Sequence, residues 1–109
     1  MLTKIEKKLI RKEETFCSNT YHPLPVVLKK GKGVYVWDVN NKKYFDYLSA
    51  YSAVNQGHCN KQILKTFIKQ AKKLTLTSRA FYNNELGSSL EYITGVFGYE
   101  KMLPMNSGA

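Results

Sequence analysis

The sequence has 109 residues, 43% of them hydrophobic, and a net charge of +9 from 15 lysines and 2 arginines against 8 acidic residues. This length and apolar content suit one small domain with a modest core and argue against a disordered chain. The lysines are spread along the chain and arginine is scarce, so the charge indicates a solvated surface and argues against a nucleic-acid-binding face.

The cysteines and the N-terminal residues indicate the cellular compartment of the protein. Cys17 and Cys59 lie far apart without Cys-x-x-Cys spacing, which argues against a zinc knuckle or a disulfide framework and favours free thiols. No apolar run is long enough to span a bilayer. The first sixteen residues contain three glutamates, which argues against a signal or transit peptide. We therefore expect a cytoplasmic protein with no membrane or nucleic-acid partner.

A helix is predicted at the N-terminus. Thr3 and Glu6 have the spacing of a capping box, and the helix should run to about Thr15. Apolar residues recur on one face of this helix, and that face needs a partner surface. The stripe consists of Leu2, Ile5, Leu9 and Ile10.

An antiparallel ribbon is predicted next. An extended run at 26–28 leads to a turn at 31–33, and runs at 34–38 and 43–47 flank Asn40-Asn41. Its aromatic residues alternate with Asp and Lys, as on a half-buried sheet face, so a base-stacking platform is the weaker interpretation. Trp37, Tyr44 and Phe45 are therefore predicted as core or interface residues.

Two helices and a strand complete the predicted elements. The helices should cover about 61–72 and 84–97, and a short strand should follow at 103–105. Between ribbon and helices, His58 invites a metal or nucleophilic interpretation. The chain has only two histidines and no acidic residue spaced to complete a ligand set, and the side chains of His58 and Cys59 are adjacent and rarely face each other. His58 is therefore predicted to hold the turn by hydrogen bonds.

Four segments carry a family resemblance. They are residues 21–25, 51–59, 74–84 and 103–109, the last ending in Asn106-Ser107-Gly108-Ala109. A strand that runs into small residues permits backbone N–H groups to approach a phosphate, although such a run also occurs in many ordinary loops. In this order, the segments resemble those of the ornithine aminotransferases, which are class III aminotransferases dependent on pyridoxal phosphate. The resemblance covers about residues 17–109 and identifies the chain as an N-terminal fragment of such an enzyme.

The resemblance implies an α/β fold, of which this fragment shows an α+β part. Residues 1–16 would form an N-terminal helical arm, and residues 17–59 the antiparallel ribbon of the small N-terminal region. Residues 60–109 would supply helices and the first strand of the large cofactor-binding domain, truncated at the phosphate loop. The arm would pack on a second subunit of a homodimer.

The resemblance also implies site residues. Ser107, Gly108 and Ala109 would bind the phosphate of pyridoxal phosphate, and Tyr21 and Tyr51 would line the substrate pocket. By spacing alone, each of the eight tyrosines is more simply a core residue, so the resemblance alone selects these two. Arg79 would lie at the subunit interface. The family's catalytic lysine, pyridine-facing carboxylate and carboxylate-binding arginine lie beyond the matching stretch, so no catalytic residue and no metal site is assigned.

The implied function is transfer of the δ-amino group of ornithine to 2-oxoglutarate, giving glutamate semialdehyde and glutamate, in amino-acid metabolism and proline biosynthesis. The fragment alone would be inactive. One alternative is a related class III transaminase acting on acetylornithine or 4-aminobutyrate. The other is a non-enzymatic basic binding module.

Overall fold

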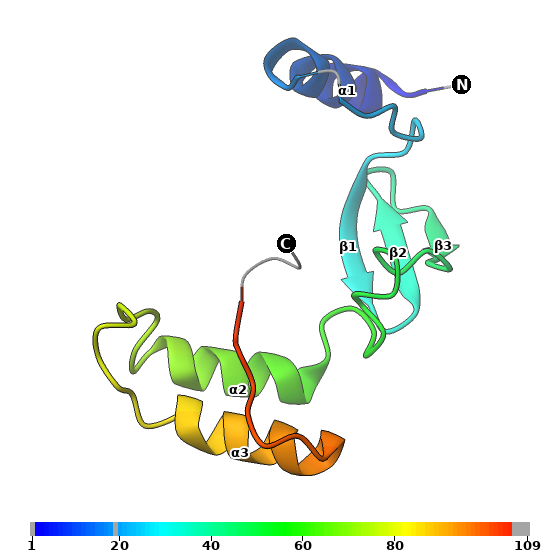
Figure 1. Ribbon diagram of the computed structural model, residues 1–109. Helices are drawn as coiled ribbons and strands as arrows, with labels where there is room; N and C mark the ends of the chain where they lie inside the picture. The colour runs from blue at the N-terminus through cyan, green and yellow to red at the C-terminus, as the bar shows by residue number, and fades with distance from the viewer. Residues whose placement is uncertain (1, 19, 106–109) are drawn as a thin grey trace. The chain divides into compact units, whose positions relative to one another are not determined.

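The computed structural model describes residues 2–18 and 20–105. Their elements follow the order α1, β1, β2, β3, α2, α3 (Figure 1). The chain divides into two compact units, Met1–Lys69 and Gln70–Ala109. The first holds α1, the three-stranded sheet and most of α2, and the second holds α3. This mixture of helix and antiparallel sheet confirms the predicted α+β character.

The first helix, α1 (Lys4–Phe16), begins as the sequence predicts. Thr3 Oγ1 accepts from the Glu6 N–H at 3.3 Å, and the Glu6 carboxylate accepts from the Thr3 N–H at 2.8 Å. Both halves of the capping box are thus present. The Thr3 hydroxyl also contacts the Asn40 side-chain oxygen at 3.2 Å, which joins the start of α1 to the sheet.

The sheet has the antiparallel order β1 (Leu28–Lys32), β2 (Tyr35–Asp38), β3 (Lys43–Phe45) (Figure 1). The first predicted turn is displaced: residues 31 and 32 belong to β1, and the turn lies at Gly33, whose φ is +58°. Glycine adopts this φ without steric cost. The second turn is as predicted, with Asn41 at φ +68°.

Asp38 organises the second turn. Its Oδ1 accepts from the N–H groups of Asn40 and Lys42, both at 2.9 Å, and its Oδ2 accepts from the Tyr44 hydroxyl at 2.8 Å. These bonds hold the pKa of Asp38 below its usual range against the opposing effect of burial, which is the largest single influence. Trp37 and Tyr44 are half-buried in the sheet, whereas Phe45 is exposed.

The remaining helices are α2 (Lys61–Ala71) and α3 (Leu86–Phe97), close to their predicted limits. The Asn60 side chain accepts from two N–H groups at the start of α2, and Asn83 does the same before α3. Gly98, at φ +72°, ends α3 in the left-handed conformation common at helix C-termini.

The strand predicted at 103–105 is absent from the part of the chain that the structure describes. A strand exists through hydrogen bonds to a neighbour, and no neighbouring strand lies beside these residues among those described. These residues have the apolar character of a strand, but no second strand is present among the described residues to pair with them.

The core is very small. Within residues 2–18 and 20–105, Val36 is the one buried hydrophobic side chain, and the polar residues Glu6 and Asp38 are buried with it. No helix in these ranges is long and apolar enough to cross a membrane. Order in the sheet therefore rests largely on hydrogen bonds.

Candidate functional site

Two tyrosines separated by thirty residues meet in the first unit. The hydroxyl oxygens of Tyr21 and Tyr51 lie 2.5 Å apart, a hydrogen bond in which either can donate. The rings remain accessible, with 69% of Tyr21 and 74% of Tyr51 exposed. These are the two tyrosines that the family resemblance implies for the substrate pocket, and the structure brings them together.

Tyr51 lies in an unusual stretch of backbone. Ser49, Ala50, Tyr51 and Ser52 all have positive φ, between 47° and 73°. Successive left-handed residues cost roughly 1–2 kcal/mol each for side chains other than glycine. Such strain persists only where the surrounding structure enforces it, and it is concentrated at functional sites.

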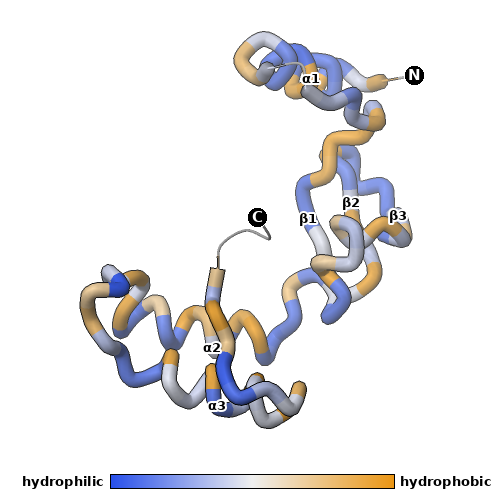
Figure 2. Tube along the Cα trace, viewed as in Figure 1, coloured by the Kyte–Doolittle hydropathy of each residue, from blue (hydrophilic) through white to orange (hydrophobic). Residues whose placement is uncertain are grey.

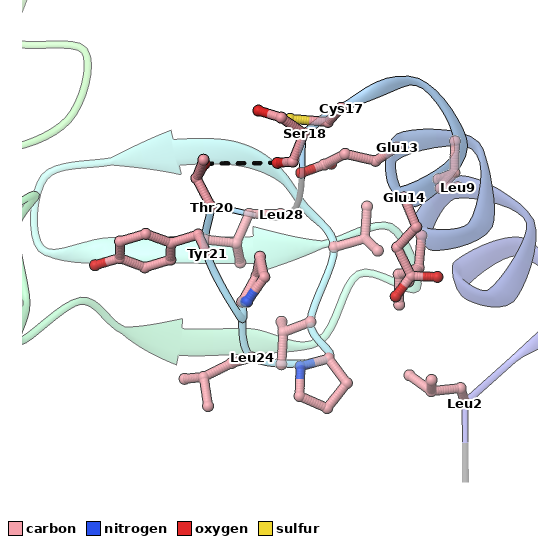
Figure 3. A pocket seen from close by; sticks show the side chains of 15 residues that line it. Leu2, Leu9, Glu13, Glu14, Cys17, Ser18, Thr20, Tyr21, Leu24 and Leu28 are labelled. Carbon is pink, nitrogen blue, oxygen red and sulfur yellow. Dashed lines mark hydrogen bonds between the residues drawn. The ribbon is translucent and has the colours of Figure 1, made fainter.

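Tyr21 lies in the extended segment that follows α1. It lines a groove of about 570 Å³ formed by α1 and residues 17–28, whose walls include Leu9 and Leu28 (Figure 3). In that view the Tyr21 ring points away from Glu13 and Glu14 of α1. Its hydroxyl therefore serves the contact with Tyr51 and not the groove.

The hydrogen bond within the pair favours the neutral form of Tyr51. The hydrogen bond to Tyr21, followed by desolvation, raises the pKa of Tyr51 above its usual value. A neutral phenol offers a donor and an acceptor beside an apolar ring. The pair can therefore bind the polar end of an aliphatic substrate without adding a competing charge.

Asp46 and His58 flank the loop that carries Tyr51. His58 Nε2 and Asp46 Oδ2 are 2.6 Å apart, and Asp46 Oδ1 accepts from the Ser49 N–H at 2.9 Å. The Ser49 bond first, and His58 second, hold the pKa of Asp46 below its usual range. His58 also exchanges two backbone hydrogen bonds with Gly33, of 2.8 and 2.9 Å. The prediction that His58 holds the turn by hydrogen bonds is confirmed.

Asp46 was missed by sequence reasoning. The signal was present, because an Asp three residues before a Ser at a strand end is typical of a side chain that accepts from a turn N–H. Its partnership with His58, twelve residues away, had no local signal.

The other candidate residues lie elsewhere. Ser107, Gly108 and Ala109 fall outside the described residues. Arg79 borders a small hollow in residues 70–85, and its interface role stays a prediction. Cys17 and Cys59 are free and exposed. Across residues 2–18 and 20–105, no three His, Cys, Asp or Glu side chains gather closely enough to hold a metal ion.

The comparison with protein families gives the class. Residues 16–109 match the family described as Aminotransferase class-III, so the chain belongs to the class III aminotransferases. This family confirms the resemblance found in the sequence.

Individual relatives of the chain carry the name ornithine aminotransferase. The chain is 60% identical over 97 residues to the mitochondrial ornithine aminotransferase of Drosophila melanogaster, covering 89% of this chain and 22% of the relative. It is 57% identical over 104 residues to that of Drosophila ananassae, covering 95% of this chain and 24% of the relative. The chain thus spans about a quarter of the length of these relatives.

Solved structures agree with this class. An acetylornithine aminotransferase from Elizabethkingia anophelis has a TM-score of 0.93 and 57% identity, covering 97% of this chain and 28% of that one. An ornithine aminotransferase from Toxoplasma gondii, described with partial occupancy of pyridoxal phosphate at its active site, has a TM-score of 0.92 and 39% identity. The match covers 94% of this chain and 24% of that one.

The expected cytoplasmic location is wrong. The two fly relatives, and those of rat and rice, are named as mitochondrial enzymes, which points to mitochondria. The expectation relied on the acidic N-terminal residues. These residues form α1, a capped helix of the folded chain, so their composition describes that helix and carries no information on targeting.

Proposed function

We propose that the chain is the N-terminal part of an enzyme that transfers the δ-amino group of ornithine to 2-oxoglutarate, producing glutamate semialdehyde and glutamate. The complete enzyme, meaning the protein of the relatives' length that contains this chain, would use pyridoxal phosphate. Support comes from membership of the class III aminotransferases and from the ornithine aminotransferases at 57% and 60% identity.

The Tyr21–Tyr51 hydrogen bond is the observation that carries the proposal. Ornithine has a reacting amine at one end of a methylene chain and an α-amino and α-carboxylate pair at the other. An enzyme acting on the terminal amine must bind the remote pair away from the reacting centre. Two adjacent phenol hydroxyls can bind that pair while their exposed rings lie along the methylene groups.

The cofactor would be held by the end of the chain. Ser107, Gly108 and Ala109 fit a phosphate because small residues let backbone N–H groups approach it closely and the serine adds a hydroxyl. Bound pyridoxal phosphate supplies an electron sink for amine transfer. This chain's own part is to hold the phosphate and to orient the remote end of the substrate.

A homodimer is part of the proposal. Ile5 and Leu9 leave the apolar face of α1 partly exposed, at 57% and 39%. A partner subunit would cover this face, and Arg79 would lie at the same type of interface. The free energy of burying apolar surface would hold the arm in place.

A second candidate is acetylornithine transamination, favoured by the likeness to the Elizabethkingia anophelis enzyme. Acetylation removes the charge of the α-amino group and adds bulk beside it. A site built around two hydroxyls that contact that group should distinguish the two substrates.

The test is a substrate comparison on the complete enzyme. We expect kcat/KM with 2-oxoglutarate to be highest for ornithine, lower for N-acetylornithine and lowest for 4-aminobutyrate, with glutamate semialdehyde as the product from ornithine. Tyr21→Phe should reduce kcat/KM for ornithine, whereas Tyr47→Phe is the control, since Tyr47 is 92% exposed and its hydroxyl makes no hydrogen bond among the described residues. A preference for N-acetylornithine would replace the first proposal with the second.

A further inference from the structure

The position of the Tyr51 hydroxyl is set mainly by the conformation of the backbone around Tyr51, since its side chain makes few contacts. Tyr51 is 74% exposed, and its hydroxyl contact with Tyr21 is its one side-chain hydrogen bond among the described residues. The backbone beneath it passes through four consecutive left-handed residues, 49–52. A side chain placed this way moves whenever that loop relaxes, so whatever holds the loop also places the hydroxyl.

Asp46 holds the first end of the loop. It follows β3, and its N–H donates to the Val34 carbonyl at 2.9 Å, so its own backbone is fixed to the sheet. Its side chain accepts from the Ser49 N–H at 2.9 Å, and the Ser49 hydroxyl donates to the Asp46 carbonyl at 3.1 Å. These bonds turn the chain into its left-handed stretch.

His58 holds the second end. Its paired backbone bonds with Gly33 fix it to the turn between β1 and β2. Its ring lies against Gly31, where a Cβ would be only 2.6 Å from the His58 Cγ. Backbone and ring are therefore both fixed, with Nε2 directed at Asp46.

The two ends are thus joined to each other as well as to the sheet. The 2.6 Å contact between Asp46 and His58 closes the loop of residues 47–57. Both side chains are partly shielded, at 18% and 27% exposure, so solvent weakens the contact less than it would a surface pair.

We propose that Asp46 and His58 are a positioning pair that keeps residues 47–57 in their strained conformation and thereby sets the Tyr51 hydroxyl against Tyr21. The structural half of this proposal concerns the loop alone. The functional half rests on the proposed role of Tyr51 in binding substrate.

The structural half is tested by hydrogen exchange in the complete enzyme. The N–H groups of Tyr51 and Val54 bond within the loop, to Leu48 and Ser49. Asp46→Ala should speed exchange of the peptide covering residues 47–57 by about tenfold or more, because it removes both the acceptor for the Ser49 N–H and the partner of His58. Asp46→Asn should recover part of the protection, because the amide oxygen still accepts from Ser49 and the amide nitrogen can donate to His58.

A glycine substitution gives a second route to the same result. Gly31→Ala removes neither partner but forces the His58 ring to move, and it should speed exchange of the same peptide. Gly95→Ala is the matched control, because a Cβ there meets nothing within 4 Å. Unchanged exchange in both Asp46→Ala and Gly31→Ala would overturn the proposal.

The functional half is tested by a double-mutant cycle with Tyr51→Phe. Asp46→Ala should raise KM for ornithine by about 5- to 10-fold, with a smaller change in kcat, since the bond is made equally in the ground and transition states. In the Tyr51→Phe background the same substitution should add little. Full additivity would show that Asp46 acts by another route and would refute the positioning role.

The two proposals can fail separately. If Tyr51→Phe alone leaves KM for ornithine unchanged, the substrate role of Tyr51 is wrong, while the exchange data still decide whether Asp46 and His58 hold the loop. Asp38→Asn controls for general loosening of the sheet, because Asp38 accepts from two turn N–H groups but none of its hydrogen bonds reaches residues 47–57. Equal loosening of that peptide by Asp38→Asn and Asp46→Asn would contradict a specific role for the pair.

Discussion

The sheet region at 28–58 satisfies its polar groups internally, whereas α2 and α3 leave their apolar groups uncovered. In the sheet region, Asp38 is only 3% exposed and each of its carboxylate oxygens has a hydrogen-bond donor. Asp46 is bonded in the same way. Most of these contacts link residues within six positions of each other, and the Asp46–His58 contact spans twelve, so the region carries the means of its own local order.

The helices are less shielded still, although Leu28, Val34 and Phe45 of the sheet region are also more than half exposed. Neither α2 nor α3 has a buried residue, and apolar stretches remain visible along both (Figure 2). On α2, Phe67 is 67% and Ile63 is 54% exposed. Helices of 11 and 12 residues are marginal in water without tertiary packing. The sheet region therefore has contacts that order it locally, while we expect the helices to be covered by a further surface in the complete enzyme.

The largest expected effect concerns activity. The 109 residues alone should show no 2-oxoglutarate-dependent turnover of ornithine, because their proposed part is to bind the cofactor phosphate and the remote end of the substrate, and no residue here is assigned to the chemistry at the cofactor. The measurement is glutamate formation by the purified chain with pyridoxal phosphate and both substrates. Turnover would mean that the chain contains catalytic residues that this account leaves out.

A substitution on α2 tests whether the exposed apolar face of this helix is covered in the complete enzyme. In the complete enzyme, Phe67→Ala should lower the free energy of unfolding by about 3 kcal/mol or more. The reason is that the apolar face of α2, which is exposed in this chain, should be buried in the complete enzyme. Lys65→Ala, on the same helix, should change it little. Urea unfolding midpoints check both variants, and equal small shifts would show that α2 has no partner surface.

A substitution at Gly108 tests the proposed phosphate site. In the complete enzyme, Gly108→Val should obstruct the approach of the backbone to the phosphate. A loss of about 1.4 to 3 kcal/mol corresponds to a roughly 10- to 150-fold rise in the dissociation constant of pyridoxal phosphate. Cofactor titration checks this, and an unchanged constant would remove Gly108 from the phosphate site.

The smallest expected effect is a loss of stability at acidic pH. Glu6, Asp38 and Asp46 have lowered pKa values, each through its hydrogen bonds. Their contribution to stability is present above the ordinary carboxyl range of about pH 4 and is lost as the pH falls through the lower folded-state values. In the purified 109-residue chain, the fluorescence of Trp37, its single tryptophan, should therefore stay constant on acidification until below about pH 4. Asp38→Asn should reduce the amplitude of the change, and a transition near pH 6 would contradict this origin.

Sequence predicted the features that depend on a few neighbouring residues. The capping box of Thr3 and Glu6, the turn at Asn41 and the limits of the two later helices all depend on hydrogen bonds within about four residues. Such bonds have residue preferences that a single sequence displays.

Sequence could not predict features set by distant partners. Nothing in Ser49-Ala50-Tyr51-Ser52 favours left-handed backbone, since none of these is glycine; the loop follows from bonds to Asp46 and from His58 further along. The strand expected at 103–105 failed for the same reason, because a strand needs a neighbour. Tyr21 and Tyr51 were selected by family resemblance, since tyrosine spacing does not distinguish a pocket from a core.

The central claim is that Tyr51 contacts the remote polar end of ornithine. Tyr51→Ile in the complete enzyme removes the hydroxyl and widens an apolar surface, so ornithine should lose more than 4-aminobutyrate, whose carboxylate takes the place of that end. The measurement is kcat/KM for both amines with the wild type and the variant. We expect the ornithine to 4-aminobutyrate ratio to fall roughly 5- to 150-fold, with normal cofactor absorbance. An unchanged ratio would contradict the claim and make Tyr51 a structural residue of the loop.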